Sequence, residues 1–191
     1  MSQPYKLTIR HITQSDEQLL KLAGDLSCIK GLVSRKRRRE RLATSAILRH
    51  DYHIAPSLLT RDSDGRPHLS INSSYISISH SKDYVAVVVS HRPIATDIEV
   101  RSERPWKIRH RVLSDDEQQF VQTPDKALIA WSVKETVYKL IGKSVYNYRE
   151  AIRIHQMSDA LRGNLQVTAR GKEITVSYHL AAEYVITLAM L

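Results

Sequence analysis

The sequence predicts an α+β protein, a pseudo-dimer of two similar halves that each pack a small antiparallel sheet with helices. First, the 191 residues leave room for two small halves, each with its own core. Second, alternating strand patterns are interspersed with capped helical patterns. Third, Ile-Ser-Ile-Ser at 76–79 and Asp-Tyr-Val at 83–85 are echoed by Ile-Thr-Val-Ser at 174–177 and Glu-Tyr-Val at 183–185. The echo predicts a boundary near residue 92, although two hairpins can also resemble each other by chance.

In the first half, residues 5–12 alternate weakly and favour a strand. Ser15 is the expected N-cap of a helix whose apolar stripe runs to Leu26, with Gly31 ending the segment. A second helix is expected after the cap Ser34. Residues 75–80 and 84–89 then favour two strands, the second buried on both faces.

The second half begins with the strand pattern Pro93 to Glu99, and the short connections before it predict a three-stranded antiparallel meander. Ser114 and Glu117 have capping-box spacing, which gives Glu117 a purely structural explanation. Thr123 and Pro124 then open a helix that should run through Ile141 and stop at Gly142.

Two acids on the strand at 93–99 are candidate metal ligands. Side chains alternate along a strand, so Asp97 and Glu99 should share a face, about 7 Å apart at roughly 3.3 Å per residue. Such carboxylates repel each other unless a cation lies between them, and hard oxygen donors suit Mg²⁺. The alternative is an exposed edge strand with two solvated acids.

The formal net charge of +9 predicts an anionic partner: nucleic acid, a phosphorylated small molecule or an acidic protein. Much of this charge lies in the run from Ser34 to Arg41, where added cations at a helix N-terminus favour phosphate binding. A solvated basic face or a nucleic-acid patch are the alternatives. With one cysteine, no signal-peptide pattern and no long apolar run, the sequence predicts a cytoplasmic protein without membrane contact.

Three segments in this order resemble the signatures of the 4′-phosphopantetheinyl transferases: Ser79-His80-Ser81, Asp97 to Glu99, and the WxxKExxxK pattern from Trp131 to Lys139. The resemblance covers roughly residues 34–143, and two halves in one chain resemble the surfactin-synthetase-activating type. It implies a pseudo-two-fold axis relating the halves in a monomer, with the site between them. The first half, 1–92, would hold the nucleotide, and the second, 93–191, the metal.

The resemblance also implies residue roles. Asp97, Glu99 and Glu135 would bind Mg²⁺, with Glu117 as a further acid near the metal. Coenzyme A would be contacted by these residues: Lys36, Arg37, Arg41, Arg66, Pro67, Ser79, His80 and Lys139. The reaction would move phosphopantetheine onto a serine of an acidic apo acyl or peptidyl carrier protein and release 3′,5′-ADP. Asp97, Glu135 and Lys139 would be the catalytic residues, with Glu135 as the base for the serine and a metal-bound water as the competing choice.

The pattern also departs from the family. Ala95 stands where the family usually has glycine, and Ser45 stands where an arginine is expected, so that Arg41 is a candidate substitute. Glu135 and Lys139 could also form an ordinary surface ion pair. A Mg²⁺-dependent nuclease and a basic nucleic-acid-binding domain are the alternative functions. The lysine lies four residues after Glu135 on a helix, unlike the strand arrangement of nucleases, and a binding domain would give the acids no purpose.

Overall fold

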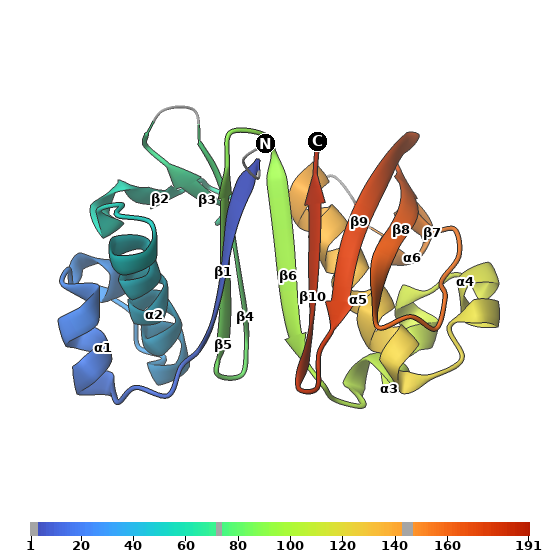
Figure 1. Cartoon of the computed structure of the whole chain (residues 1–191), viewed down its shortest axis with the longest axis horizontal. Helices are drawn as coiled ribbons and strands as arrows, with labels where there is room; N and C mark the ends of the chain where they lie inside the picture. Colours follow the sequence, from blue (N-terminus) through green and yellow to red (C-terminus); the bar gives the residue numbers. More distant parts are fainter. Residues whose placement is uncertain (1–3, 72–73, 143–146) are drawn as a thin grey trace. The chain divides into compact units, whose positions relative to one another are not determined.

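The computed structural model describes residues 4–71, 74–142 and 147–191. The chain divides into two compact units, Met1–Arg92 and Pro93–Leu191, which we call the first and second units and describe separately. Among the helices of the described ranges, none is both long and apolar enough to cross a membrane. The predicted fold class, α+β with small antiparallel sheets packed with helices, is confirmed (Figure 1).

The first unit places two helices against a sheet. Its elements are β1 (Tyr5–His11), α1 (Asp16–Ala23), the 3₁₀ turn η1 (Ser27–Ile29), α2 (Arg35–Asp51), the 3₁₀ turn η2 (Pro56–Leu58), β2 (Leu59–Arg61), β3 (Pro67–Leu69), β4 (Tyr75–Ser81) and β5 (Tyr84–Ser90). The main sheet has the order β1-β5-β4, with both pairs antiparallel, and β2 pairs with β3. Residues of α1, α2 and β5 form the buried core, which includes Leu19, Leu48 and Val85.

Capping side chains set where these helices begin. Ser15 and Gln18 form a reciprocal capping box on α1, and the Ser34 hydroxyl accepts the backbone N–H of Arg37 on α2. The predicted continuation of the first helix to Leu26 is wrong. Gly24 adopts a left-handed conformation (φ 71°) that ends α1 after Ala23, because glycine adopts positive φ without steric cost.

The predicted three-stranded meander is also wrong in its third strand. β4 and β5 form the expected hairpin, but the other edge of β5 is taken by β1. The strand that follows, β6 (Ile94–Val100), therefore cannot pair with β5, and it pairs with β10 (Tyr184–Met190) in the sheet of the second unit.

The second unit has a five-stranded antiparallel sheet in the order β6-β10-β9-β8-β7. Its other elements are α3 (Arg104–Val112), α4 (Asp115–Phe120), α5 (Pro124–Ile141), α6 (Tyr148–Ala151), β7 (Ile152–Ile154), β8 (Arg162–Ala169) and β9 (Lys172–Leu180). The helix α5 begins and ends as predicted, with the Thr123 hydroxyl as N-cap and Gly142 after its last turn.

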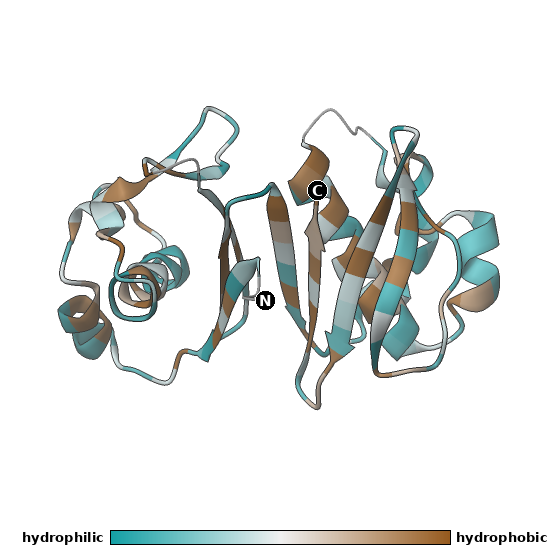
Figure 2. Cartoon of the chain, turned by 45° about the horizontal axis from the view of Figure 1, so that its top comes forward, coloured by the Kyte–Doolittle hydropathy of each residue, from teal (hydrophilic) through white to brown (hydrophobic). Residues whose placement is uncertain are grey.

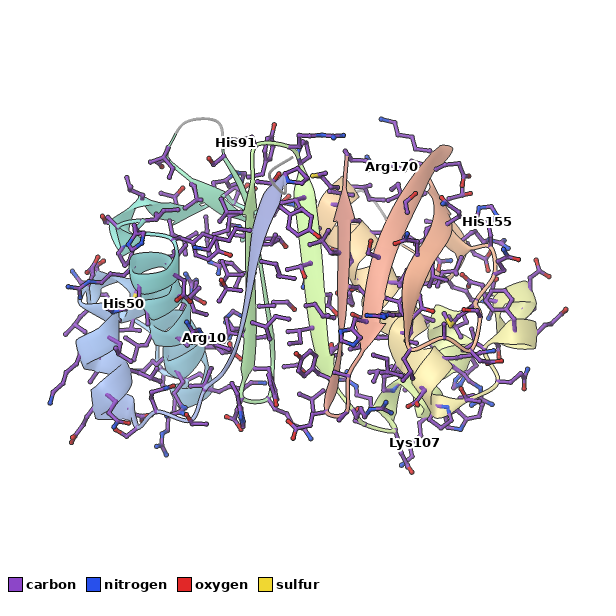
Figure 3. All side chains as sticks on the ribbon, in the orientation of Figure 1. Arg10, His50, His91, Lys107, His155 and Arg170 are labelled. Atoms are coloured by element: carbon purple, nitrogen blue, oxygen red, sulfur yellow. The ribbon has the colours of Figure 1, made fainter. Side chains whose placement is uncertain are left out.

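Helix α5 packs against β6, β10 and β9 and forms the centre of the second core. Its residues Ala130, Val133 and Val137 are fully buried there. The strands β8 and β9 alternate buried and exposed side chains, which Figure 2 shows as alternating bands of hydropathy. In these two strands one face therefore covers the core and the other carries polar side chains, whereas β6 and β10 are buried on both faces.

The two units share a three-stranded motif, since β1-β5-β4 and β6-β10-β9 have the same order and pairing directions. Val85 pairs with His80 as Val185 pairs with Leu180, so Ile76 corresponds to Val176 by strand pairing. The sequence echo aligned Ile76 with Ile174, two residues away. An offset of two keeps every side chain on the same face, which explains why the pattern remained visible.

Candidate functional site

The two acids of β6 face helix α5, as the strand alternation predicts. The Ser132 hydroxyl donates to Asp97 Oδ2 at 2.9 Å, and Lys139 Nζ donates to Asp97 Oδ1 at 2.7 Å. The indole N–H of Trp131 donates to Glu99 Oε1 at 3.2 Å. Asp97 is only 3% exposed, so the alternative of two solvated acids does not describe it.

Glu135 lies on the same helix, between the residues that bind Asp97. The pKa of Glu135 is raised to about 7, mainly by burial and by the negative charges of Asp97 and Glu99, while Lys139 and a hydrogen bond from Tyr148 act in the opposite direction. Asp97 and Glu99 are thus close enough for their charges to act on Glu135. The structure brings together four predicted residues of the second unit: Asp97, Glu99, Glu135 and Lys139.

These acids suit Mg²⁺ in chemical kind, because they offer hard oxygen donors and carry a repulsion that a divalent cation relieves. Within residues 4–71, 74–142 and 147–191, however, no three His, Cys, Asp or Glu side chains are grouped closely enough to hold a metal ion as they stand. The Lys139 ammonium is bonded to Asp97 in this arrangement.

Glu117 has a different environment from these acids. Its Oε2 accepts the Lys134 ammonium at 2.7 Å and the Ser114 backbone N–H at 2.7 Å, and its Oε1 accepts the Ile154 backbone N–H at 2.8 Å. Both oxygens are therefore taken by the protein itself. These bonds agree with the capping-box explanation of Glu117, and its expected role as a further acid near the metal stays a prediction.

Lys134 was not among the predicted site residues, because its position in the apolar stripe of α5 is typical of a core residue. It is fully buried, and burial lowers its pKa, against the opposing charge of Glu117. Its ammonium also donates to the backbone oxygens of Val112 and Tyr148 at 3.0 and 3.3 Å. The buried pair of Lys134 and Glu117 thereby holds α6 beside α5 and positions the Tyr148 side chain. The ring of Tyr148 stacks on that of Tyr138, with 4.8 Å between the ring centroids.

Apart from Lys139, the predicted coenzyme A contacts lie on the first unit. His80 Nε2 is 3.1 Å from the hydroxyl of Thr44 on α2, and the neighbouring Ser79 is buried on β4. Arg66 and Pro67 follow a turn organised by Asp62, which accepts the Arg66 backbone N–H at 2.9 Å. Thr44 connects His80 directly to the basic helix.

Within the basic run of α2, several cations serve the fold itself. Arg35 and Arg39 both bind Asp16 at the start of α1, and Lys36 lies 3.9 Å from Glu40. Arg41 lies near Arg61, a residue that the motifs did not indicate. Burial lowers the pKa of the Arg61 guanidinium, and the charge of Arg41 lowers it further. Two neighbouring guanidiniums favour an anion between or beside them.

Ser45, which stands where an arginine was expected, is buried at 2% exposure. A cation at this position would enter the core beneath α2, so this helix turn contributes no charge. Arg41, one turn earlier, is the cation that α2 places beside Arg61. This supports the expectation of Arg41 as the substitute without testing its contact with a nucleotide.

A family model of the 4′-phosphopantetheinyl transferase superfamily matches residues 93–189 of the 191-residue chain. The matched segment contains β6 and α5 with all four clustered residues, and the chain belongs to this superfamily. Among curated proteins, the 4′-phosphopantetheinyl transferase gsp of Aneurinibacillus migulanus is 28% identical over 95 residues. This alignment covers 47% of the chain and 40% of that relative's length.

Proposed function

We propose that the protein transfers the 4′-phosphopantetheine arm of coenzyme A to a serine of an acyl or peptidyl carrier protein, in the manner of the surfactin-synthetase-activating type. The observation that carries this proposal is the attachment of both β6 acids to α5. Asp97 is bonded to Ser132 and Lys139, and Glu99 is bonded to Trp131. This arrangement presents carboxylates and an ammonium together, as phosphoryl transfer requires.

Asp97, Glu99 and Glu135 would hold Mg²⁺, which supplies positive charge to the pyrophosphate as its bond breaks. Lys139, one turn after Glu135, would place a second cation beside the same pyrophosphate. On the first unit, His80, Ser79, Arg41 and Arg66 would orient the phosphates and adenine side of coenzyme A. Lys36 and Arg37, at the exposed start of α2, would meet its 3′-phosphate.

In the proposed reaction the serine oxygen forms a bond to the phosphorus that carries the pantetheine arm. The bond from that phosphorus to the bridging oxygen breaks, and 3′,5′-ADP leaves with the electron pair. Glu135, acting directly or through a water molecule, accepts the serine proton. The buried backbone of β6 keeps Asp97, which is itself buried, in place.

The carrier protein is the proposed macromolecular partner. The net charge of +9 favours encounter with an acidic domain, and this attraction weakens with salt. We propose a monomer in the cytoplasm that acts without nucleic acid or a membrane.

Mass spectrometry of an apo carrier protein after incubation with coenzyme A and Mg²⁺ tests the proposal. The expected product carries the mass of one phosphopantetheine group, and Asp97→Asn or Glu135→Gln abolishes the gain while circular dichroism shows an intact fold. Ser177→Ala, on the exposed face of β9, is a matched control that should keep the activity. No mass gain, combined with Mg²⁺-dependent cleavage of duplex DNA, would instead establish the nuclease alternative.

A further inference from the structure

Behind Asp97 lies a chain of three buried hydroxyl groups that the proposed chemistry does not use. Ser132 Oγ is 2.9 Å from Asp97 Oδ2 and 2.9 Å from Thr187 Oγ1, and Thr187 Oγ1 is 2.6 Å from Thr136 Oγ1. Ser132 and Thr136 come from α5, and Thr187 comes from β10. All three side chains are at most 1% exposed, so none of them can contact a substrate.

The chemistry of the groups fixes the direction of the first bond in this chain. An ionised carboxylate only accepts hydrogen bonds, so Ser132 must donate its single proton to Asp97. The Thr187 hydroxyl lies within hydrogen-bond distance of Ser132 Oγ and Thr136 Oγ1. It also lies 3.1 Å from the Ser132 backbone oxygen and 3.4 Å from the Asp97 backbone oxygen. Thr187 therefore ties both the side chain and the backbone of Ser132 to β10.

The repeat within the chain offers an internal comparison. Strand pairing makes Val87 of β5 the counterpart of Thr187, and Thr8 of β1 the counterpart of Asp97. Val87 is fully buried in its own sheet. In the first unit, where the neighbouring strand has no carboxylate, the shared motif thus has a valine at this position. In the second unit, where the neighbouring strand carries Asp97, it has a hydroxyl group.

We infer that Ser132 is a positioning residue for Asp97, and that Thr187 and Thr136 complete a hydroxyl chain that holds this carboxylate in one orientation. With Oδ2 fixed by Ser132, Oδ1 is the oxygen left to face Lys139 and the cation. The inference rests on the proposed function in so far as Asp97 binds Mg²⁺. It adds that the affinity for Mg²⁺ is set partly by residues that never touch the metal.

Titration of the free protein with Mg²⁺, followed by calorimetry, tests the inference without any transfer reaction. Ser132→Ala should weaken Mg²⁺ binding about ten- to a hundredfold, the usual cost of losing the partner of a metal ligand. Thr187→Val should weaken it less, because Ser132 still donates to Asp97 and loses only its contact with the Thr187 hydroxyl. Ser177→Ala removes a serine hydroxyl from an exposed face and should leave the affinity unchanged. Wild-type affinity in a folded Ser132→Ala protein would overturn the inference.

A double-mutant cycle in metal-free protein tests the positioning role of Ser132 separately from the proposed metal site. In urea unfolding, Ser132→Ala should lower the folding equilibrium constant about tenfold with Asp97 present. In an Asp97→Asn background, Ser132→Ala should lower the folding equilibrium constant less than about threefold, because a neutral amide accepts a weaker hydrogen bond than a carboxylate. If the wild-type protein does not bind Mg²⁺, the metal assignment fails, and the cycle still decides whether Ser132 positions Asp97. Equal losses in the two backgrounds would refute the positioning role.

Discussion

At the scale of single residues, Glu135 carries the clearest electrostatic signature. Burial and the neighbouring acids raise its pKa to about 7, well above that of a solvated glutamate. Between pH 4.5 and 7 the folded state keeps a proton that the unfolded state releases. Stability therefore falls as pH rises through this window, by up to about 3 kcal/mol, and the cost persists above it.

Glu135→Gln should remove this cost, because glutamine cannot ionise. In EDTA at pH 8 we expect the variant to unfold at higher urea concentration than the wild-type protein, whereas at pH 5 the two should differ little. Chemical denaturation at both pH values measures the difference. A difference of the same size at pH 5 and pH 8 would contradict the raised pKa.

The buried pair of Lys134 and Glu117 makes a second prediction at this scale. Lys134→Met would leave the Glu117 carboxylate buried and without its cation, at an expected cost of about 3–5 kcal/mol in urea denaturation. Adding Glu117→Gln should recover part of the loss, since the uncompensated charge is then gone. A cost below about 1 kcal/mol for the single variant would show that the pair is not needed to hold α6.

The sequence identified the residues with distinctive chemistry but not their supporting partners. Asp97, Glu99, Glu135 and Lys139 stand at motif spacings, and strand and helix periodicity brings them together. Ser132 and Thr187 carry no such signal, because a serine on a helix and a threonine on a strand are ordinary residues. Only the packing of α5 on β10 turns their hydroxyl groups toward a carboxylate.

At the scale of elements, helix α2 combines structural and candidate binding cations. The Lys36 side chain is 71% exposed and lies 3.9 Å from Glu40, whereas Arg39 bridges to Asp16 and to the Gln14 backbone oxygen on the approach to α1. Neighbouring cations on one helix should therefore respond differently to removal.

Lys36→Ala should raise the KM for coenzyme A about tenfold with little change in kcat, and should not affect dephospho-coenzyme A, which lacks the 3′-phosphate. Arg39→Ala should instead lower the melting temperature and leave that KM unchanged. Steady-state kinetics with both substrates separate these effects. A rise in the KM for the carrier protein alone, mimicked by high salt, would assign α2 to protein recognition instead.

The starts of four helices were predictable from their capping side chains, which are Ser15, Ser34, Ser114 and Thr123. The pairing of β6 was not predictable from local patterns. Short connections favour the pairing of strands that are consecutive in the sequence, but β5 pairs with β1 from the start of the chain. Because these two strands are far apart in the sequence, a short segment of the sequence does not reveal that they pair.

At the scale of the whole molecule, each unit has a core made from its own residues. The buried residues of one cluster lie between Ile12 and Val87, and those of the other between Val112 and Ala189. The pseudo-two-fold relation between the halves stays a prediction, while the shared strand motif is present in both units.

Because the two cores are separate, a substitution in one core should destabilise that unit more than the other. Leu48→Ala empties space in the first core, at a cost of about 2–5 kcal/mol. Hydrogen exchange should then quicken in β4 and β5 while β8 and β9 remain protected. Mass spectrometry of peptic fragments resolves the two regions. Equal loss of protection in both would show that the units unfold as one.

The strand order also bears on how the protein is made. In each unit the strand that comes last along the chain, β5 or β10, lies between the first strand and its hairpin partner. Synthesis proceeds from the N-terminus, so β1 and β4 must wait for β5, and β6 and β9 for β10. Neither sheet can close before its final strand has left the ribosome, and until then the nascent chain exposes strand edges to chaperones or to other chains. Because β10 also carries Thr187, the hydroxyl chain behind Asp97 is completed only at that last step.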